Sequence, residues 1–497
     1  MRRIIALVLA AAMLLTLSAC QKKTPADKDV SKPQEKPVEL TELQKREKEL
    51  AEIFDEENIV FTFGAISDIH LDGAYMAESS YNKATKAYKT LQELATNKLD
   101  AVVIAGDLVN CTNSIGNVFS DDKYVGTREE NYPKQSKAER ENFKKAVKDA
   151  LPDDIALFYC LGNHDSVSNK HTTDFIDSFT ADGTYKRYFS HDVDMEKTAQ
   201  GLRHSIIGGY HFFGIELSAH PYTQATYDWL RTEFDKIIAK DKNTPIFLAA
   251  HYSPEYSKGY AAEGKDTFDE LLKEYPQVIT FNGHDHDFVQ KETSIMQDEN
   301  GYIALNCGSA CYFLLQNTTP GLECANANKG YIESFHGGLL LEIDKNGNIR
   351  VRRINFKTGT ICADDWIITA MKDGKRTLDY TRARAEKAVK PTFKKGTKLL
   401  LEQSKYNLRL AFDAATCEDY VYYYKVEIIN DKTSETCKTF GITSRFFAEK
   451  SKADSLTRFD LHVAPLDPGD YTVIVTPYDT FSSAGQTLTG TITIPAA

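Results

Sequence analysis

The sequence lacks several features that mark particular classes of protein. Beyond the first 20 residues it has no apolar run long enough to cross a bilayer as a helix, so we expect no transmembrane helix there. None of its nine cysteines forms a Cys-x-x-Cys pair, which argues against a structural zinc site. Acidic residues outnumber basic ones and give the chain a net charge of -11. This charge argues against a protein that binds nucleic acid through its phosphates, and against a nuclease. At 497 residues, the chain exceeds the usual size of a single core and predicts at least two domains.

The N-terminus has the pattern of an export signal. Arg2 and Arg3 precede an apolar stretch, residues 4–17, which is too short to span a bilayer. Leu17-Ser18-Ala19-Cys20 resembles the lipobox of bacterial lipoproteins, which implies removal of residues 1–19 and lipidation of Cys20. The alternative is a plain secretory signal with an incidental cysteine. We therefore expect an exported protein, lipid-anchored to the outer face of the bacterial cell membrane, with residues 20–50 as a flexible tether that turns helical from Leu40.

Five short apolar runs follow the tether, and each ends in polar residues. The runs are residues 61–67, 101–105, 155–161, 246–250 and 278–281, and helix-like stretches occupy 81–96, 136–150 and 224–239. Continuously apolar strands alternating with helices predict an α/β domain with buried sheets. Gly208-Gly209, Asn300-Gly301 and Asn346-Gly347 interrupt later runs and predict added antiparallel hairpins. Because ligands bind at the carboxyl ends of strands in such folds, we expect the polar clusters to meet.

The polar residues at these strand ends form one chemical set. Its members are Asp68 and His70 after the first run, Asp107 after the second, Asn163 after the third, His251 after the fourth, and His284 and His286 after the fifth. Each cluster alone is weak evidence, since polar residues are common in turns. Together they offer carboxylate, amide and imidazole ligands without a thiolate, a combination that suits manganese, iron or zinc.

The order of these motifs resembles the calcineurin-like metallophosphoesterases. Asp-x-His, Gly-Asp-x-x-Asn, Gly-Asn-His-Asp, His and Gly-His-x-His follow one another between about residues 61 and 356. The resemblance implies two stacked mixed β-sheets flanked by helices, holding two divalent or trivalent metal ions (Mn, Fe or Zn). It implies that one ion is held by Asp68, His70, Asp107 and His286, and the other by Asp107, Asn163, His251 and His284. Asp107 would then bridge the two ions.

The implied activity is hydrolysis of phosphate esters, either monoesters or diesters. Two cations would neutralise the phosphoryl oxygens and lower the pKa of a bound water, so that a metal-bridging hydroxide attacks phosphorus. The resemblance makes His164 the general acid for the leaving oxygen, with Asp165 orienting its imidazole. Asn110 would reach the bound phosphoryl group or would simply be a turn residue. No tyrosine stands in the second cluster, where purple acid phosphatases use one to bind iron, which disfavours that subfamily.

The remaining chain predicts accessory structure. We expect the phosphoesterase domain over residues 51–361, a connector over 362–395 and, over 396–497, a small all-β sandwich that resembles fibronectin type III or immunoglobulin-like modules. The alternative is an accessory layer of the first domain. A disulfide between Cys417 and Cys437 is the favoured pairing. Long segments at 110–133 and 166–204 are expected to form substrate loops, with candidate residues His171, Tyr185, Arg187 and His191, joined by His220 and Tyr252 on later loops. The alternative for each of these residues is a solvent-exposed or structural role.

Two classes of function fit this pattern. The first is a two-metal hydrolase whose partner is a small phosphate ester and whose membrane contact is the lipid anchor alone. The second is a catalytically silent binding or adhesion lipoprotein on the same scaffold, with protein or glycan contacts through the C-terminal module. All expected ligands and His164 are intact, which favours the enzyme.

Overall fold

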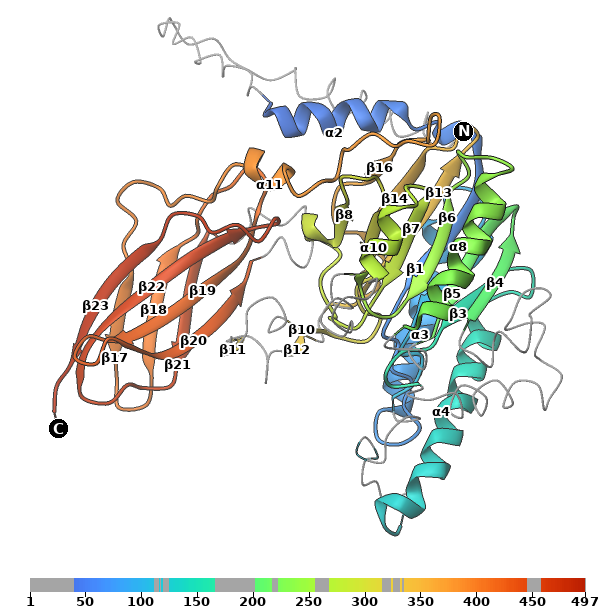
Figure 1. Cartoon of the computed structure of the whole chain (residues 1–497). Coiled ribbons are helices and arrows are strands. Elements are labelled where there is room, and N and C mark those ends of the chain that lie inside the picture. The colour runs from blue at the N-terminus through green and yellow to red at the C-terminus, as the bar shows by residue number, and fades with distance from the viewer. Residues whose placement is uncertain are drawn as a thin grey trace, which may run out of the picture. The chain divides into compact units, whose positions relative to one another are not determined.

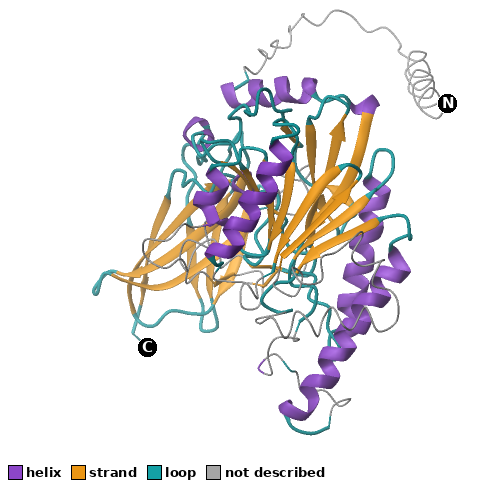
Figure 2. Ribbon diagram, turned by 45° about the vertical axis from the view of Figure 1, so that its right-hand side comes forward, coloured by secondary structure: helices purple, strands orange, loops and turns teal. Residues whose placement is uncertain are grey.

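Two stacked sheets flanked by helices form the body of the protein (Figures 1 and 2). The computed structural model describes residues 40–110, 116, 118, 125–165, 202–216, 222–254, 268–314, 323–324, 331–332, 335–444 and 457–496. The signal segment, Cys20, His171, Tyr185, Arg187, His191 and His220 lie outside these ranges. Among the described residues, no helix combines the length and apolarity that a membrane crossing requires.

The first sheet has seven strands and carries three of the predicted polar clusters. Its order is β15 (Thr360–Ile361), β14 (Ile349–Asn355), β13 (Gly337–Asp344), β1 (Ile59–Ile66), β2 (Ala101–Ala105) and β3 (Ala156–Cys160), with β16 (Trp366–Ile368) also paired to β14. β1, β2 and β3 are parallel, whereas β13 runs antiparallel to β1. The carboxyl ends of β1, β2 and β3 therefore lie at one edge.

The second sheet has six strands and carries the other two clusters. Its order is β4 (Leu202–Ile207), β5 (Tyr210–Ile215), β6 (Ile246–Ala250), β7 (Val278–Asn282), β9 (Ile303–Asn306) and β8 (Ile295–Gln297). β5, β6, β7 and β9 are parallel, and the predicted Gly208-Gly209 turn joins β4 to β5 as a hairpin. The mixed-sheet architecture expected from the sequence is confirmed.

The alternation of side chains in β1 explains how the layers stack. Phe63 faces the second sheet, where its ring lies 4.9 Å from that of Phe247, 5.4 Å from Phe212 and 5.7 Å from Phe281, measured between centroids. Gly64 faces the opposite way and leaves room for Leu91 of α3 (Ala77–Leu94). One strand thus contributes to both the sheet–sheet core and the sheet–helix core, because successive side chains point to opposite faces.

Helices cover the outer faces through apolar stripes at helical spacing. α3 and α4 (Arg128–Ala150) pack against the first sheet, and α8 (Gln224–Ile238) and α10 (Phe268–Lys273) against the second. α4 begins earlier than the predicted residue 136, because Thr127 and Glu130 form a reciprocal capping box at its first turn. Residues 128–133, expected to lie in a loop, therefore belong to a helix.

The C-terminal part contains two further antiparallel sheets. β17 (Leu400–Gln403), β18 (Leu408–Asp413) and β21 (Arg458–Val463) form one; β20 (Glu435–Thr443), β19 (Val421–Asn430), β22 (Gly469–Asp479) and β23 (Leu488–Ile494) form the other. β11 (Glu323–Cys324) pairs with β20, while β10 (Phe313–Leu314) and β12 (Tyr331–Ile332) pair with each other. Side chains of both C-terminal sheets share one core, which includes Phe412, Tyr424 and Val473. The expected C-terminal all-β region is present.

Two sequence-based expectations outside the metal-type clusters need correction, whereas a third agrees with the structure. Part of the predicted connector is β16, whose Trp366 is buried and pairs with Val351 of β14. The tether turns helical close to Leu40, as expected, in helix α2 (Glu42–Ile53), with Leu43 and Leu50 buried. The thiols of Cys417 and Cys437 are both free, so the expected disulfide is wrong.

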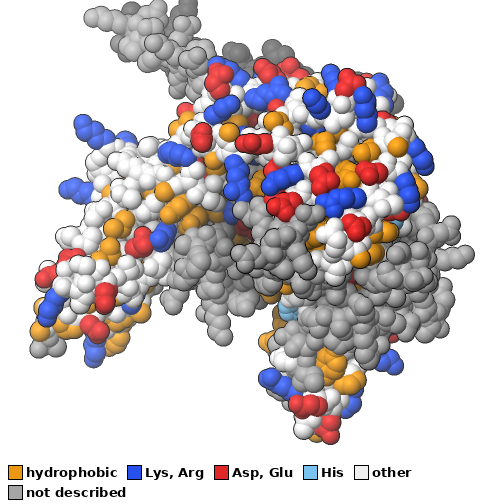
Figure 3. All heavy atoms as spheres, in the orientation of Figure 1, with side chains coloured by type: hydrophobic (Ala, Val, Ile, Leu, Met, Phe, Trp, Pro, Cys, Tyr) orange, Lys and Arg blue, Asp and Glu red, His pale blue; other side chains and the backbone are white. Residues whose placement is uncertain are grey.

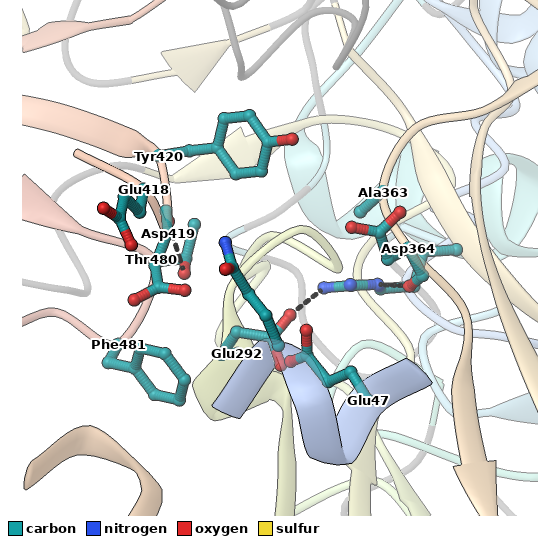
Figure 4. Close-up of a pocket in the computed structure, with 11 residues that line it drawn as sticks. Glu47, Glu292, Ala363, Asp364, Glu418, Asp419, Tyr420, Thr480 and Phe481 are labelled. Carbon is teal, nitrogen blue, oxygen red and sulfur yellow. Dashed lines mark hydrogen bonds and ion pairs between the residues drawn. The ribbon is translucent and has the colours of Figure 1, made fainter. Parts of the chain in front are cut away.

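Short elements join the C-terminal sheets to the body. Glu292 begins the 3₁₀ turn η5 (Glu292–Ser294); its amide donates to Thr480 O at 2.8 Å and its carboxylate accepts from Arg384 of α11 (Arg384–Lys387) at 2.9 Å. The same carboxylate pairs with Arg353 at 2.8 Å. Figure 4 shows the pocket around it, which also includes Glu47 of α2. The other carboxylates that line this pocket, such as Glu47, lie around Glu292. The charge of Glu292 is already neutralised by Arg353 and Arg384.

The visible surface mixes both signs of charge. On the face drawn in Figure 3, basic and acidic side chains are interspersed over the described part of the chain. In the described part of the chain, exposed ion pairs include Lys242–Asp373 and Arg458–Asp413. Exposed pairs of this kind contribute little to stability, about 0–1 kcal/mol each.

Candidate metal centre

The structure brings all seven residues predicted to be ligands to one place. Asp68 and His70 follow β1, Asp107 follows β2 and Asn163 follows β3; His251 follows β6, and His284 and His286 follow β7. The first two strand ends continue side by side, because Asp68 N donates to Gly106 O at 3.1 Å and His70 N donates to Asp107 O at 3.0 Å. The loop after β9 closes against them, with Ser309 Oγ donating to Asp68 O at 3.2 Å.

One half of the centre is built from Asp68, His70 and His286. His286 Nε2 lies 3.1 Å from Asp68 Oδ1 and 3.1 Å from His70 Nε2, and all three residues are buried. Their ligand atoms lie within 4.8 Å of one another, so the group could hold a metal ion. The Nδ1 atom of His286 lies 2.9 Å from the carbonyl of Tyr312, which directs Nε2 toward the cluster.

The other half is built from Asn163, His251 and His284. Asn163 Oδ1 lies 2.9 Å from His284 Nδ1 and 3.1 Å from His251 Nε2. His251 Nδ1 bonds the carbonyl of Ala105 at 2.7 Å, so its Nε2 faces Asn163. A backbone carbonyl thus fixes the ring orientation of one imidazole in each half of the centre, as is usual for histidines that bind metals.

Asp107 lies between the two halves. Its Oδ2 atom is 3.2 Å from His251 Nε2 and 3.7 Å from His70 Nε2. Its Oδ1 atom accepts the amide of His164 at 2.8 Å, which fixes the carboxylate plane. This is the place that a bridging carboxylate would occupy.

Electrostatics tie the two carboxylates to the imidazoles. Burial alone would raise the pKa of Asp68, but the neighbouring His286 outweighs it and holds the pKa well below the usual range. Burial likewise opposes protonation of His251, yet the charge of Asp107 raises the pKa of that imidazole to about 10. His70 and His284 have no such dominant partner, and burial lowers the pKa of each to about 4. A proton on His251 thus balances the negative charge of Asp107, which a bound cation would otherwise balance.

The residues present fit a metal ion. Within the described residues, Asp68 Oδ1 is buried and accepts no hydrogen bond, although it faces two imidazole nitrogens. A buried carboxylate oxygen without a donor costs free energy, which a coordinated cation would recover. Oxygen and imidazole donors together suit manganese, iron or zinc.

Glycines make the close approach of these side chains feasible. A Cβ atom at Gly162 would overlap Asp107, one at Gly106 would overlap His251, and one at Gly283 would overlap Ser67 and Asp68. Each glycine of the sequence motifs therefore leaves space for a ligand from another strand end. The sequence showed these glycines as turn residues only.

His164 and Asp165 occupy different surroundings from those expected. The carboxylate of Asp165 accepts the amides of Val109 at 2.8 Å, Gly162 at 2.9 Å and Leu108 at 3.0 Å. His164 Nδ1 instead lies 2.7 Å from the carbonyl of Asn110. The expected orienting contact of Asp165 is therefore replaced by a backbone carbonyl, and Asp165 ties the third strand end to the second. His164 remains beside the cluster, with its ring 4.6 Å from that of His70.

Two tyrosines flank the centre. The ring of Tyr312 lies 4.3 Å from that of His286, and the ring of Tyr252 lies 4.4 Å from that of His284. Tyr252 was a candidate from the sequence, whereas Tyr312, in the loop after β9, was missed because it stands at no recognisable spacing from the motifs. Asn110 lies at the same edge, with its side-chain amide 3.4 Å from the carboxylate of Asp72, a buried residue that sequence reasoning also missed.

Comparison with known proteins identifies the domain that holds this centre. Residues 61–288 match the sequence model of the family described as calcineurin-like phosphoesterase. This part of the chain is a calcineurin-like phosphoesterase domain. The match begins in β1 and ends just after the His284–His286 motif, so it contains every residue of the two half-sites.

Several known proteins are similar to this chain over part of their length. Purple acid phosphatase 15 of Arabidopsis thaliana is 23% identical over 205 residues, which cover 40% of this chain and 37% of the plant protein. The solved structure of purple acid phosphatase PPD1 from yellow lupin (Lupinus luteus) has 14% identity and a TM-score of 0.40, covering 66% of this chain and 56% of the lupin chain. For the 5'-nucleotidase precursor of Thermus thermophilus the identity is 12% and the TM-score 0.29, covering 66% of this chain and 58% of that one.

The purple acid phosphatase relatives bear on one prediction. The second cluster, Gly106-Asp107-Leu108-Val109-Asn110, contains no tyrosine that could bind iron. The similarity to the plant protein covers only part of both chains, and the argument that the absent tyrosine disfavours the purple acid phosphatase subfamily remains a prediction.

Proposed function

We propose that the domain is a two-metal hydrolase of phosphate esters. The position of Asp107 between two sets of ligand atoms carries this proposal, since one carboxylate faces His70 on one side and His251 on the other. Asp68, His70 and His286 would hold one ion, Asn163, His251 and His284 the other, and Asp107 both. When bound, two divalent cations offset the charge of the phosphoryl oxygens and make water a better nucleophile near neutral pH.

The protein's own residues supply the remaining chemistry. His164 donates a proton to the leaving oxygen, and the Asn110 carbonyl at its Nδ1 atom holds the orientation of the ring. Proton donation matters most for esters whose leaving groups are poor, because those oxygens cannot depart as anions. Tyr252 and Tyr312 form aromatic walls beside the two half-sites.

A substrate panel with purified protein and Mn²⁺ tests the proposal. It compares simple monoesters, simple diesters, cyclic nucleotides and nucleotide sugars. We expect hydrolysis of at least one class by the wild type and its loss in Asp107→Ala, together with lower metal content. Asp228→Ala, which changes an exposed carboxylate on α8, is the matched control and should leave both unchanged. Full activity in metal-loaded Asp107→Ala would refute the mechanism, and no hydrolysis by the wild type would favour the binding lipoprotein.

A further inference from the structure

Among the strands that the structure describes, β3 lies at the edge of the first sheet. β3 pairs with β2 on one side, and β2 pairs on with β1. An edge strand leaves a row of backbone groups without a neighbouring strand. The carbonyl of Tyr159 and the amide of Leu161 point to the same side, because they are two residues apart along a strand. Leu161 directly precedes Gly162 and the Asn163-His164 pair.

Two charged residues of the second sheet occupy this edge. Arg203 of β4 donates through Nη1 to Tyr159 O at 2.9 Å, and Glu216, the residue after β5, accepts the amide of Leu161 through Oε2. Arg203 Nη2 and Glu216 Oε1 form an ion pair at 2.5 Å. Arg203 is 4% exposed and Glu216 is 0% exposed, so the whole arrangement is buried.

The aromatic side chain of β3 takes part in the same arrangement. The guanidinium carbon of Arg203 lies 4.5 Å from the centre of the Tyr159 ring. Gly214 of β5 pairs with Arg203 across the β4–β5 hairpin, and its lack of a side chain leaves room for Phe158 of β3. The hairpin of the other sheet, together with Glu216 directly after it, thus contacts the end of β3 through its side chains.

Stability alone does not explain a buried ion pair at this place. Desolvating two charges is costly, and apolar residues of similar size often stabilise a protein as well or better. Apolar residues cannot, however, offer one donor and one acceptor matched to Tyr159 O and Leu161 N. The ion pair therefore specifies where the strand end lies relative to the second sheet.

That location matters for the metal centre. Asn163 comes from the first sheet, but its Oδ1 atom must meet His251 and His284 of the second, at 3.1 and 2.9 Å. Arg203 and Glu216 link the same two sheets through the backbone of residues 159–161, which lie shortly before Asn163 in the chain. A shift of the strand end would move Asn163 and His164 together.

We propose that Arg203 and Glu216 are positioning residues, whose ion pair binds β3 on the side where no described strand pairs with it and holds the end of β3 so that Asn163 and His164 reach the metal centre. The inference rests on the proposed function, since it assigns the pair a task at that site. Neither residue touches the ligand cluster in the role we assign; each acts through the backbone of residues 159–161.

Glu216→Gln and Arg203→Met test the proposal, with Glu342→Gln as the matched control. Glu342 is also buried, pairs with Arg350 at 2.6 Å and accepts the amide of Thr96, but it lies on β13 opposite Thr62, at the start of β1. Two quantities are measured: the Mn²⁺ affinities of the metal-free proteins, and the dependence of kcat on the leaving-group pKa across aryl phosphates.

We expect both test variants to bind the more weakly held Mn²⁺ at least about tenfold less tightly, as is typical when a partner that orients a ligand is lost. The dependence of kcat on the leaving group should steepen, because a displaced His164 protonates the leaving oxygen less well. Glu342→Gln should lower the melting temperature to a similar degree and change neither quantity. Arg203→Lys retains the charge and should fall between the wild type and Arg203→Met.

Unchanged Mn²⁺ affinities and leaving-group dependence in folded Arg203 and Glu216 variants would overturn the positioning role while leaving the proposed function intact. A wild type that binds no Mn²⁺ and hydrolyses no ester would overturn the proposed function itself. If the wild type binds Mn²⁺ without hydrolysis, the Mn²⁺ affinities of the variants alone decide the positioning role. Should Glu216→Gln not fold, the two Arg203 variants decide it in the same way.

Discussion

The backbone is strained at the residues that face one another in the centre. Asp68, His70, Asp107, His284 and His286 all have positive φ, between 48° and 72°. Few non-glycine residues adopt this conformation, and each instance costs about 1–3 kcal/mol, so it persists where surrounding structure enforces it. Among the described non-glycine residues with positive φ, most belong to this one cluster. Strain concentrated at a cluster of metal-type ligands supports a functional site there.

Gly162 tests the packing of the centre at the residue scale. In Gly162→Ala the new methyl group would overlap the Asp107 carboxylate and displace it from its place between His70 and His251. We expect a loss of Mn²⁺ affinity of about tenfold or more, measured by titration of the metal-free protein.

Gly209→Ala is the control for this substitution. Gly209 also has positive φ, but a Cβ there meets nothing within 4 Å, so the variant should lose stability without losing Mn²⁺ affinity. Equal Mn²⁺ affinities in Gly162→Ala and the wild type would show that Asp107 does not hold the ions.

His164 separates metal binding from turnover. In His164→Ala all seven predicted ligands remain, so we expect wild-type metal content by elemental analysis. Because no proton donor remains for the leaving oxygen, kcat should fall by about 10²–10⁴-fold, and most for alkyl esters. Loss of bound metal in this variant would instead make His164 a ligand, a role that its closeness to His70 and Asp107 permits.

Residue identities were more predictable than residue contacts. The seven ligand candidates could be read from motifs, because each follows an apolar run that forms a strand. The hydrogen-bond partners of Asp165 could not be read from motifs, since the amides of Leu108 and Val109 come from a different strand end. Tyr312 and the pair Arg203–Glu216 were missed for the same reason: their roles depend on contacts between distant segments.

At the scale of elements, strands with continuous apolar runs were predicted to within one or two residues. β2 and β6 have the predicted bounds, because strands buried on both faces show an uninterrupted apolar signal. β20 was missed because its first residues are exposed and polar, and β16 because it has only three residues after Asp364-Asp365. A pattern that short carries too little periodicity to distinguish a strand from a connector.

The β4–β5 hairpin should make the protein sensitive to acid. His204 stacks on Phe213, its cross-strand partner, with ring centroids 4.1 Å apart, and its side chain is 25% exposed. Burial, with His211 nearby, lowers the pKa of His204 from 6.5 to about 4. Because the folded state disfavours the protonated ring, this stability is present above pH 6.5 and is lost as pH falls toward 4.

Replacing the imidazole of His204 tests the predicted direction of this pH dependence of stability. In His204→Phe the stack on Phe213 remains but nothing titrates, so the drop in unfolding free energy from pH 7 to pH 5 should shrink by up to about 2 kcal/mol. Urea denaturation at both pH values measures it, with His462→Phe, at an exposed position, as the control. An unchanged drop in His204→Phe would show that this histidine does not cause the acid sensitivity.

At the scale of the whole molecule, the sequence predicted an α/β domain and a C-terminal all-β sandwich. It did not predict the contacts between them. Tyr422 of β19 is fully buried and shares a core with Phe288 of the phosphoesterase domain, their ring centroids lying 5.7 Å apart. Such contacts link residues far apart in the chain, and no local pattern encodes them. Residues 42–497 accordingly form one compact unit.

Shared core residues predict cooperative unfolding. We expect calorimetry to give one transition for the wild type, with calorimetric and van't Hoff enthalpies equal. Tyr422→Ala removes a ring from the shared core and should separate the transition into two. Two transitions already present in the wild type would mean that the C-terminal sheets unfold independently of the body.

The central claim is that five strand ends from two sheets assemble one two-metal centre. Diffraction from crystals grown with Mn²⁺, recorded near the manganese absorption edge, tests it most directly. The account predicts two anomalous peaks roughly 3.5–4 Å apart, with Asp107 touching both, Asp68, His70 and His286 around one, and Asn163, His251 and His284 around the other. A single peak, or peaks away from these residues, would contradict it.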